Sequence, residues 1–324
     1  MGPAPSPEEK GRGVTAAIET EGLTKRYGSH QALRGVDLHV PAGTVLGVLG
    51  RNGAGKTTTV RILSTLLVPD SGRAFVAGLD VVREQAEVRT RIGLTGQYAA
   101  VDDRLTGREN LVLLGTLLHI GRSAAKSRAR ELLAQFDLTD AGDRQVRTYS
   151  GGMRRRLDLA SCLISRPPVV FLDEPTTGLD PASRAVLWAA IREQAAAGTT
   201  VLLTTQYLEE ADKLADRVVV IDAGKVVAEG SPEQLKRDVG GEWLEVSVTD
   251  PSRTGEAREI LASVAGSVEV ADGKLSAPVP DGTAGIAAVA GKLHANGIAV
   301  QEFALRRPSL DDVFFALTRT SEAV

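Results

Sequence analysis

Short, uninterrupted apolar runs recur along the first two thirds of the chain. They occupy residues 44–49, 169–173, 200–205 and 217–222, and each is closed by a glycine or a polar residue. Runs of this length without alternation are typical of strands that are buried on both faces. Helical segments separate the runs, so the pattern predicts an α/β fold in which helices cover both faces of a sheet.

The segment before and around the first run has a different pattern. Between residues 18 and 50, apolar and polar residues alternate, as in "VDLHV", and the turn-forming segments "YGSH" and "PAG" interrupt the alternation. A period of two, broken by Gly and Pro, predicts half-buried strands joined by turns.

Capping sequences mark several helix starts. Thr106 with Glu109 and Ser231 with Gln234 match the capping box, and Asp180 stands as an N-cap before a proline. These positions predict helices that begin at about residues 107, 181 and 232.

Three parts follow one another along the chain. After about residue 240, short strands and short helices alternate, which predicts a small α+β domain with the glycine pair Gly240–Gly241 at its seam. Residues 99–147 are predicted to be helical, and with the next helix they form an inserted helical subdomain of about residues 99–165. The expected organisation is a Pro- and Gly-rich disordered leader at residues 1–17, a main domain at 18–238 and an accessory domain at 239–324.

Composition restricts the possible partners. A net charge of -3 argues against a protein that binds nucleic acid mainly through charge, so no nucleic-acid partner is expected. The longest apolar stretch, which begins at Leu111, is far shorter than the roughly 20 residues that a bilayer requires. The single Cys162 can form no intrachain disulfide, and its apolar neighbours predict a packed position. Any membrane role is therefore expected to come through a partner.

A glycine-rich loop carries the first candidate chemistry. Residues 50–57 fit the pattern G-x-x-x-x-G-K-[ST], with a buried strand before the loop and a predicted helix after it. The backbone amides of such a loop turn toward phosphates, a lysine adds a cation for the terminal phosphates, and the last hydroxyl can bind magnesium. The strand-loop-helix context favours this interpretation over a chance glycine-rich turn. The candidate nucleotide-binding residues are Gly50, Arg51, Asn52, Gly53, Ala54, Gly55, Lys56, Thr57 and Thr58.

Two adjacent carboxylates close the second buried strand. In "VVFLDEP", Asp173 stands at the tip of the strand, where it can hold magnesium together with Thr57, and Glu174 follows it. We expect Glu174 to act as a general base toward an attacking water. Taken alone, the segment would be an ordinary turn at the end of a strand; the phosphate loop makes the catalytic interpretation the stronger one.

A second glycine pair stands before a helix that carries no lysine. The segment "YSGGM" contains Ser150, Gly151 and Gly152, and it precedes the carboxylates, while "TTGLD" with Asp180 follows them. With the phosphate loop, these motifs resemble the ATP-binding subunit of the ABC transporter family over about residues 18–236. The resemblance implies a P-loop NTPase fold with a mixed sheet, an N-terminal antiparallel β subdomain and an inserted helical subdomain.

The resemblance also implies roles for individual residues. Ser150 to Met153 would be the signature loop, Gln97 the glutamine loop that binds Mg²⁺ and senses the γ-phosphate, Asp180 the D-loop aspartate, and Tyr27 the aromatic that stacks on adenine. Each ATP would lie between the phosphate loop of one copy and the signature loop of the other in a head-to-tail homodimer. A second phosphate cradle without lysine is then explained, because it completes a site that already holds Lys56 of the partner copy.

Simpler interpretations stay open for several of these residues. Gln97 is also compatible with an ordinary polar loop position, Asp180 with an N-cap alone, and Tyr27 with simple packing. The arginines at 154–156 are expected to form a solvated helix face, with a phosphate or nucleic-acid role as the alternative.

One position departs from the family pattern. Most members have a histidine after the third buried run, where it contacts the γ-phosphate, and this chain has Gln206. A glutamine amide donates a comparable hydrogen bond but cannot take up a proton. We therefore expect Glu174 alone to be the base and Gln206 to be a passive phosphate contact.

The branch of the family is indicated by three longer segments. "TTQYLEEAD", "SGGMRRRLDLA" and "RRPSLDDVFFALT" resemble the daunorubicin-resistance branch of drug exporters. This resemblance implies an ATPase that uses ATP and Mg²⁺, works with separately encoded membrane permease subunits and lies at the cytoplasmic face of the cell membrane. In the last segment, Leu310, Val313, Phe314 and Leu317 form an apolar stripe that either packs on its own domain or docks a partner.

Other functions share parts of this pattern. Another exporter or an importer would carry the same core motifs, whereas a soluble ABC ATPase acting on ribosomes or DNA usually has two cassettes or a long coiled-coil insertion. A non-catalytic drug-sequestering protein would not need Glu174 beside Asp173. An ATPase subunit of a drug exporter is the expected function.

Overall fold

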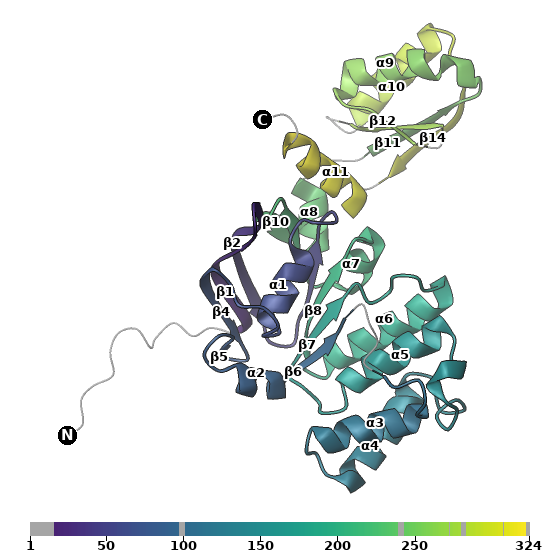
Figure 1. The fold of residues 1–324 in the computed structure, drawn as a ribbon. Coiled ribbons are helices and arrows are strands. Elements are labelled where there is room, and N and C mark those ends of the chain that lie inside the picture. Colours follow the sequence, from purple (N-terminus) through teal and green to yellow (C-terminus); the bar gives the residue numbers. More distant parts are fainter. Residues whose placement is uncertain are drawn as a thin grey trace, which may run out of the picture. The chain divides into compact units, whose positions relative to one another are not determined.

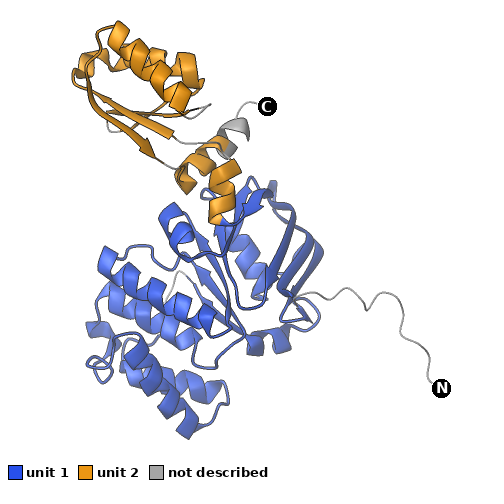
Figure 2. Cartoon of the chain, turned by 180° about the vertical axis from the view of Figure 1, so that it is seen from behind, with its two compact units in different colours: residues 1–231 blue, residues 232–324 orange. Residues whose placement is uncertain are grey.

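The chain forms two compact units, residues 1–231 and residues 232–324 (Figure 2). The computed structural model describes residues 16–96, 101–238, 243–271, 273–279, 283–306 and 308–321. The division between the units precedes helix α8, Pro232–Asp238, whereas the sequence pattern placed a boundary after residue 238. Strand β1 begins at Ala16, two residues inside the expected leader, and residues 1–15 lie outside the described part.

A six-stranded sheet forms the centre of the first unit. Its order is β10-β9-β3-β8-β7-β6, and all neighbours are parallel except β9 and β10. The predicted mixed α/β sheet is confirmed, and the carboxyl ends of its parallel strands meet at one edge. The strands are β3 Val45–Leu49, β6 Ile92–Thr95, β7 Val169–Asp173, β8 Thr200–Thr205, β9 Arg217–Asp222 and β10 Lys225–Gly230.

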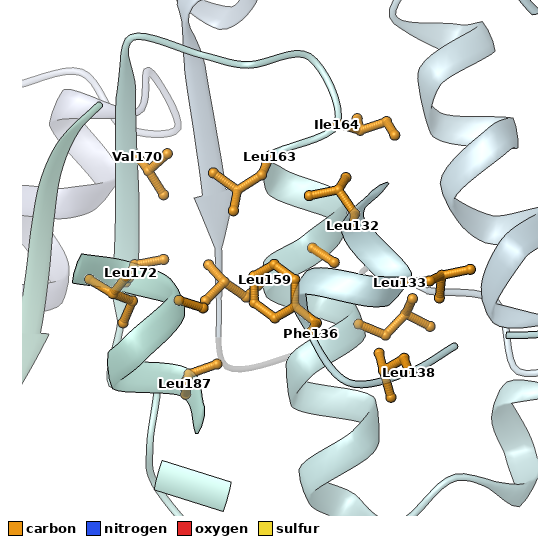
Figure 3. Close-up of a cluster of buried hydrophobic side chains, with 14 of the residues drawn as sticks. Leu132, Leu133, Phe136, Leu138, Leu159, Leu163, Ile164, Val170, Leu172 and Leu187 are labelled. Carbon is orange, nitrogen blue, oxygen red and sulfur yellow. The ribbon is translucent and has the colours of Figure 1, made fainter. Parts of the chain in front are cut away.

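Both faces of this sheet are covered, which explains the continuous apolar runs. Alternate residues of β7 enter different cores: Val170 and Leu172 pack with helices α5 and α6, while Val169 and Phe171 pack with α1 and the N-terminal strands (Figure 1). Figure 3 shows the first of these cores, with the Phe136 ring among leucines of several helices. Helices α1 Lys56–Leu63 and α2 Gln85–Arg91 contribute to the core shared with the N-terminal strands, and α6 Pro181–Ala196 and α7 Leu208–Leu214 contribute to the core on the other face.

The N-terminal segment forms the expected antiparallel sheet. Its order is β2-β1-β4-β5, and the β1–β2 hairpin turns at residues 28–29. One face of this sheet packs on the core to which α1 also contributes, and residues of three strands, Ile18, Val36 and Val76, are fully buried there. The strands are β1 Ala16–Tyr27, β2 His30–Pro41, β4 Ser71–Val76 and β5 Leu79–Asp80.

Three helices, α3, α4 and α5, fall within the range predicted for the inserted subdomain. Helix α3 begins with the predicted capping box, because Thr106 accepts from Glu109 N while the Glu109 carboxylate accepts from Thr106 N. Burial raises the pKa of the Cys162 thiol well above its usual range, and its sulfur donates to Leu94 O, so this cysteine is packed as expected. The helices are α3 Gly107–Leu117, α4 Arg122–Gln135, the 3₁₀ turn η2 Val146–Thr148, and α5 Gly151–Cys162.

The second unit is an α+β domain. Its four strands pair antiparallel in the order β12-β13-β11-β14, and α9 and α10 pack on the sheet through Leu244, Val246, Leu261 and Leu293. The elements are β11 Trp243–Val248, η3 Pro251–Arg253, α9 Thr254–Ala265, β12 Glu269–Ala271, β13 Lys274–Pro278, α10 Thr283–Ala295, β14 Val300–Arg306 and α11 Leu310–Ser321.

Helix α11 packs against α8 inside this second unit. Of the predicted stripe, Leu310 and Val313 are buried and Phe314 is half-buried, while Phe315, which is not part of the stripe, is exposed. The side chain of Leu317 lies outside the described residues. Arg306 forms a bidentate ion pair with Asp312, which ties β14 to the start of this helix. Among the described residues, no helix is both long and apolar enough to cross a bilayer.

Candidate functional site

The glycine-rich loop connects the fully buried strand β3 to helix α1. Gly55 has φ +114°, and a Cβ at this position would come within 2.7 Å of Ala32 O, so no side chain fits there without distortion. Ala54 N donates to Arg51 O, which closes the turn, and Gly224 N donates to Ala54 O. Arg51, Asn52, Gly53 and Thr57 are exposed, Thr58 is half-buried, and Gly50, Ala54, Gly55 and Lys56 are buried.

Lys56 lies over the loop that precedes it. Its Nζ donates to Gly50 O at 2.7 Å and to Arg51 O at 3.2 Å, and the residue is 5% exposed. Burial lowers the pKa of this ammonium, whereas the charges of Glu174 and Asp173 act in the opposite direction. An ammonium held this way suits polyphosphate oxygens, which can replace the loop carbonyls as its partners.

Asp173 lies at the end of β7 beside two hydroxyl groups. Its Oδ1 accepts from Thr57 Oγ1 at 3.2 Å and from Thr204 Oγ1 at 2.5 Å. A carboxylate and a hydroxyl in contact are oxygen ligands that Mg²⁺ accepts, and this ion usually completes its shell with phosphates and waters. No cluster of three or more His, Cys, Asp or Glu suited to a metal ion occurs among the described residues. Thr57 and Asp173, two of the three predicted Mg²⁺ ligands, are in contact with each other and fit this ion, while the third, Gln97, lies outside the described residues.

The backbone of Glu174 adopts the left-handed conformation, which is uncommon for a residue other than glycine. Its φ is +48°, its N–H donates to Thr204 O at 3.1 Å and to Thr204 Oγ1 at 3.2 Å, and its carboxylate accepts from Thr177 Oγ1 at 3.4 Å. A non-glycine residue in this region is held there by its surroundings. The two adjacent carboxylates thus make different contacts.

Helix α5 begins with the second glycine pair. Ser150 is its N-cap and accepts from Met153 N at 3.2 Å, and the adjoining Gly151 is exposed. A Cβ on Gly152 would come within 2.5 Å of Ser183 Oγ, so a larger residue at this position would displace the Ser183 side chain. An exposed helix N-terminus with free amides attracts anions.

Asp180 shares the neighbourhood of Gly152. It is the N-cap of α6, where it accepts from Ser183 N at 2.9 Å and from Ser183 Oγ at 2.7 Å, and these hydrogen bonds lower the pKa of its carboxyl. The predicted N-cap role is confirmed. The structure therefore arranges the predicted residues in two groups: one around Lys56 and Asp173, the other around Ser150 and Asp180.

Two further predicted residues, Tyr27 and Gln206, are described outside these two groups, and a third is not described. Tyr27 ends β1 and is 45% exposed, which leaves its ring available for stacking. Gln206 follows β8 as an exposed residue. Gln97 lies outside the described residues, immediately after Gly96.

The arginines at 154–156 differ from the predicted solvated face. Arg154 pairs with Asp103 at the surface, but the side chains of Arg155 and Arg156 are only 15% and 13% exposed and donate to backbone carbonyls. The prediction is wrong for these two because their guanidinium groups reach segments that are remote in the sequence.

Sequence reasoning also missed Thr204 and Glu210. Thr204 is fully buried in β8 and contacts both carboxylate residues through Asp173 Oδ1 and Glu174 N. Glu210 is fully buried in α7, where it accepts from Trp188 Nε1 at 3.2 Å, and burial raises the pKa of its carboxyl. No sequence signal separates either residue from an ordinary strand threonine or a helix glutamate.

Comparison with known proteins agrees with this geometry. The family model described as "ABC transporter" matches residues 33–177, and the model described as "ATP-binding protein DrrA1-3-like, C-terminal domain" matches residues 230–318. A solved structure, described as the ATP-binding subunit of an ABC transporter, superposes with a TM-score of 0.63 at 27% identity over 69% of this chain and 93% of that chain.

Two curated proteins are similar over nearly the whole chain. The daunorubicin resistance ATP-binding protein DrrA2 of Streptomyces coeruleorubidus is 57% identical over 93% of this chain and 95% of its own length. The daunorubicin/doxorubicin resistance ATP-binding protein DrrA of Streptomyces peucetius is 51% identical over 94% and 93%, respectively. The chain therefore belongs to the ATP-binding subunits of the ABC transporter family and is an ATPase with a DrrA-type C-terminal domain.

Proposed function

We propose that the chain hydrolyses Mg²⁺-ATP as a head-to-tail homodimer and thereby drives export of a drug or antibiotic. The observation that carries the proposal is the division of the site into two groups. One group has the cation and the carboxylates, around Lys56 and Asp173, and the other has an exposed helix N-terminus at Ser150 with no lysine in its motif. Each group supplies what the other lacks for binding a triphosphate.

The proposed nucleotide site is composite. Lys56 binds the terminal phosphates, the loop amides of residues 50–55 surround them, and the Tyr27 ring stacks on adenine. Across the dimer interface, the amides at Ser150, Gly151 and Gly152 of the second copy bind the same phosphates, and Asp180 fixes the adjoining loop. ATP then holds the two copies together until it is hydrolysed.

Hydrolysis is assigned to residues at the ends of β7 and β8. Glu174 accepts a proton from the attacking water; its carboxylate contacts Thr177 Oγ1, whereas the carboxylate of Asp173 contacts the hydroxyls of Thr57 and Thr204. Gln206 donates a hydrogen bond to the γ-phosphate without taking up a proton. Such a general base contributes about 10²- to 10⁴-fold to the rate.

Thr57 and Asp173 would hold Mg²⁺, with Gln97 as a further ligand. When bound, this ion neutralises charge on the β- and γ-phosphate oxygens. Thr204 orients Asp173 through the 2.5 Å hydrogen bond to Oδ1, so the ligand oxygen is fixed before nucleotide binds.

The cargo and the partners are proposed from the relatives. DrrA2 and DrrA are named for resistance to daunorubicin, or to daunorubicin and doxorubicin, and both match this chain over more than nine tenths of its length. We infer that separately encoded permease subunits form the pathway and that this chain lies at the cytoplasmic face of the cell membrane.

Efflux from cells tests the proposal. Cells that express the chain with the permease subunits from its own gene neighbourhood are loaded with daunorubicin, and efflux is followed with the intact chain and with Glu174→Gln. We expect efflux only with the intact chain. Equal efflux with Glu174→Gln, or with the permease alone, would exclude the proposed role.

A further inference from the structure

Arg155 of α5 joins the ends of two strands to this helix. Its Nε donates to Pro175 O at 2.8 Å, its Nη1 to Gly96 O at 2.8 Å, and its Nη2 to the carbonyls of Asp173 and Glu174 at 3.1 Å each. All three guanidinium nitrogens are therefore used. Three of these carbonyls, those of Gly96, Glu174 and Pro175, belong to the segments that follow β6 and β7, and the fourth, that of Asp173, ends β7.

The guanidinium is fixed from its own helix as well. Asp158, one turn further along α5 and almost fully buried, pairs with Arg155 Nη1 at 3.3 Å. Arginine has five N–H donors in a planar fork, whereas lysine has a compact ammonium that cannot reach several separated carbonyls at once. The geometry at residue 155 is thus specific to arginine and not simply to positive charge.

The backbone of Glu174, the predicted base, is held by hydrogen bonds on both sides. On one side, Glu174 N donates to Thr204; on the other, the Glu174 carbonyl accepts from Arg155. The φ of +48° at Glu174 is sparsely populated by non-glycine residues and persists only where neighbours hold it. Loss of the Arg155 contacts would let this peptide relax and move the Glu174 carboxylate.

We propose that Arg155 is a positioning residue that couples the two ATP sites of the dimer. The helix that carries it starts at Ser150, which closes the partner's site, while its side chain holds Glu174 of its own site. A displacement at the end of β7 is passed to the start of α5, and closure on the partner's ATP is passed back to Glu174. This inference rests on the proposed head-to-tail dimer and adds the connection between its two sites.

The test variant is Arg155→Lys, which keeps a cation beside Asp158. Its matched control is Arg156→Lys, because Arg156 lies on the same helix with similar exposure but donates to carbonyls of Phe136 and Asp137, away from the site. Thermal unfolding of both variants first establishes that they are folded. If Arg155→Lys does not fold, Arg155→Gln combined with Asp158→Asn, which removes both charges, takes its place.

Two measurements distinguish coupling of the two ATP sites from a purely structural role of Arg155. In steady state, we expect Arg155→Lys to lower kcat for ATP by about 10- to 100-fold, with KM changed by less than about threefold, because a small misplacement of the base affects chemistry more than binding. In a Glu174→Gln background, where hydrolysis is removed, we expect the ATP-dependent dimer to dissociate at least about tenfold more readily. Arg156→Lys should change neither readout by more than about twofold.

The outcomes are distinct. A normal kcat in Arg155→Lys, or a lowered kcat with an unchanged dimer, would overturn the coupling, and so would equal effects in Arg156→Lys. If Glu174→Gln forms no dimer with ATP even when the permease subunits are present, the head-to-tail site itself is refuted, and this result is distinct from a failure of the coupling through Arg155.

Discussion

Thr204 offers a sensitive test of how the metal ligand is held. Thr204→Val replaces the hydroxyl by a methyl group of similar size at a fully buried position, so packing changes little. It removes the 2.5 Å hydrogen bond to Asp173 Oδ1 and one of two acceptors of Glu174 N, which keeps Thr204 O as its partner at 3.1 Å. The main loss is therefore one hydrogen bond to a carboxylate.

The expected loss of stability is that of a single hydrogen bond. A hydrogen bond to a charged group contributes about 1.5–3 kcal/mol to stability. For a unit of 231 residues, this corresponds to a fall in Tm of roughly 3–12 °C. Loss of a group that orients a metal ligand typically costs about 10- to 100-fold in metal affinity or activity, so the Mg²⁺ concentration for half-maximal ATPase should rise by about that factor.

The assay is ATPase activity as a function of free Mg²⁺, alongside thermal unfolding. Thr200→Val is the control, because Thr200 is equally buried at the other end of the same strand, where its hydroxyl accepts from Gly43 N and lies away from Asp173. Both variants should lose stability, but only Thr204→Val should shift the Mg²⁺ dependence. An unchanged Mg²⁺ dependence in Thr204→Val would refute the argument that Thr204 orients Asp173.

Three further predictions follow from other parts of the first unit. Gly55→Ala should abolish ATP binding, measured by calorimetry, because its Cβ meets Ala32 O, whereas Gly78→Ala, with a similar positive φ and open space, should keep it. Phe136→Ala should destabilise the first unit by about 3–5 kcal/mol in a denaturation titration, because the ring is fully buried. Burial raises the pKa of Glu210 above its unfolded value, so its contribution to stability is present below about pH 4.5 and is lost as pH rises; Tm should fall less between about pH 5 and pH 8 in Glu210→Gln. An equally steep Tm profile in that variant would contradict the assigned burial.

Local pattern was sufficient for much of the fold. Four apolar runs predicted strands β3, β7, β8 and β9 to within a residue, because a strand covered on both faces consists mainly of apolar residues, whereas β6 and β10 were not among the predicted runs. The capping box at Thr106 and the N-cap at Asp180 could also be predicted from the sequence, because their hydrogen-bond partners lie only three residues away. The phosphate loop could be predicted as well, because its motif occupies a single short segment, residues 50–57.

Contacts between residues that are remote in the sequence could not be predicted from local patterns. The adjacent arginines at 154–156 look alike in sequence, but Arg155 reaches carbonyls 18 to 59 residues away and Arg154 forms a surface pair with Asp103. The grouping of α8 with the second unit has a similar cause, because this helix packs against α11, about 75 residues further along the chain. No local pattern contains such information.

Size-exclusion chromatography of Glu174→Gln, with and without Mg²⁺-ATP, tests the central claim most directly. The account predicts a shift from monomer to dimer on adding Mg²⁺-ATP, and loss of that shift when Ser150→Arg is added, because the new side chain blocks the exposed start of α5. A dimer that forms equally well with Ser150→Arg, or no ATP-dependent dimer even with the permease subunits present, would contradict the composite site.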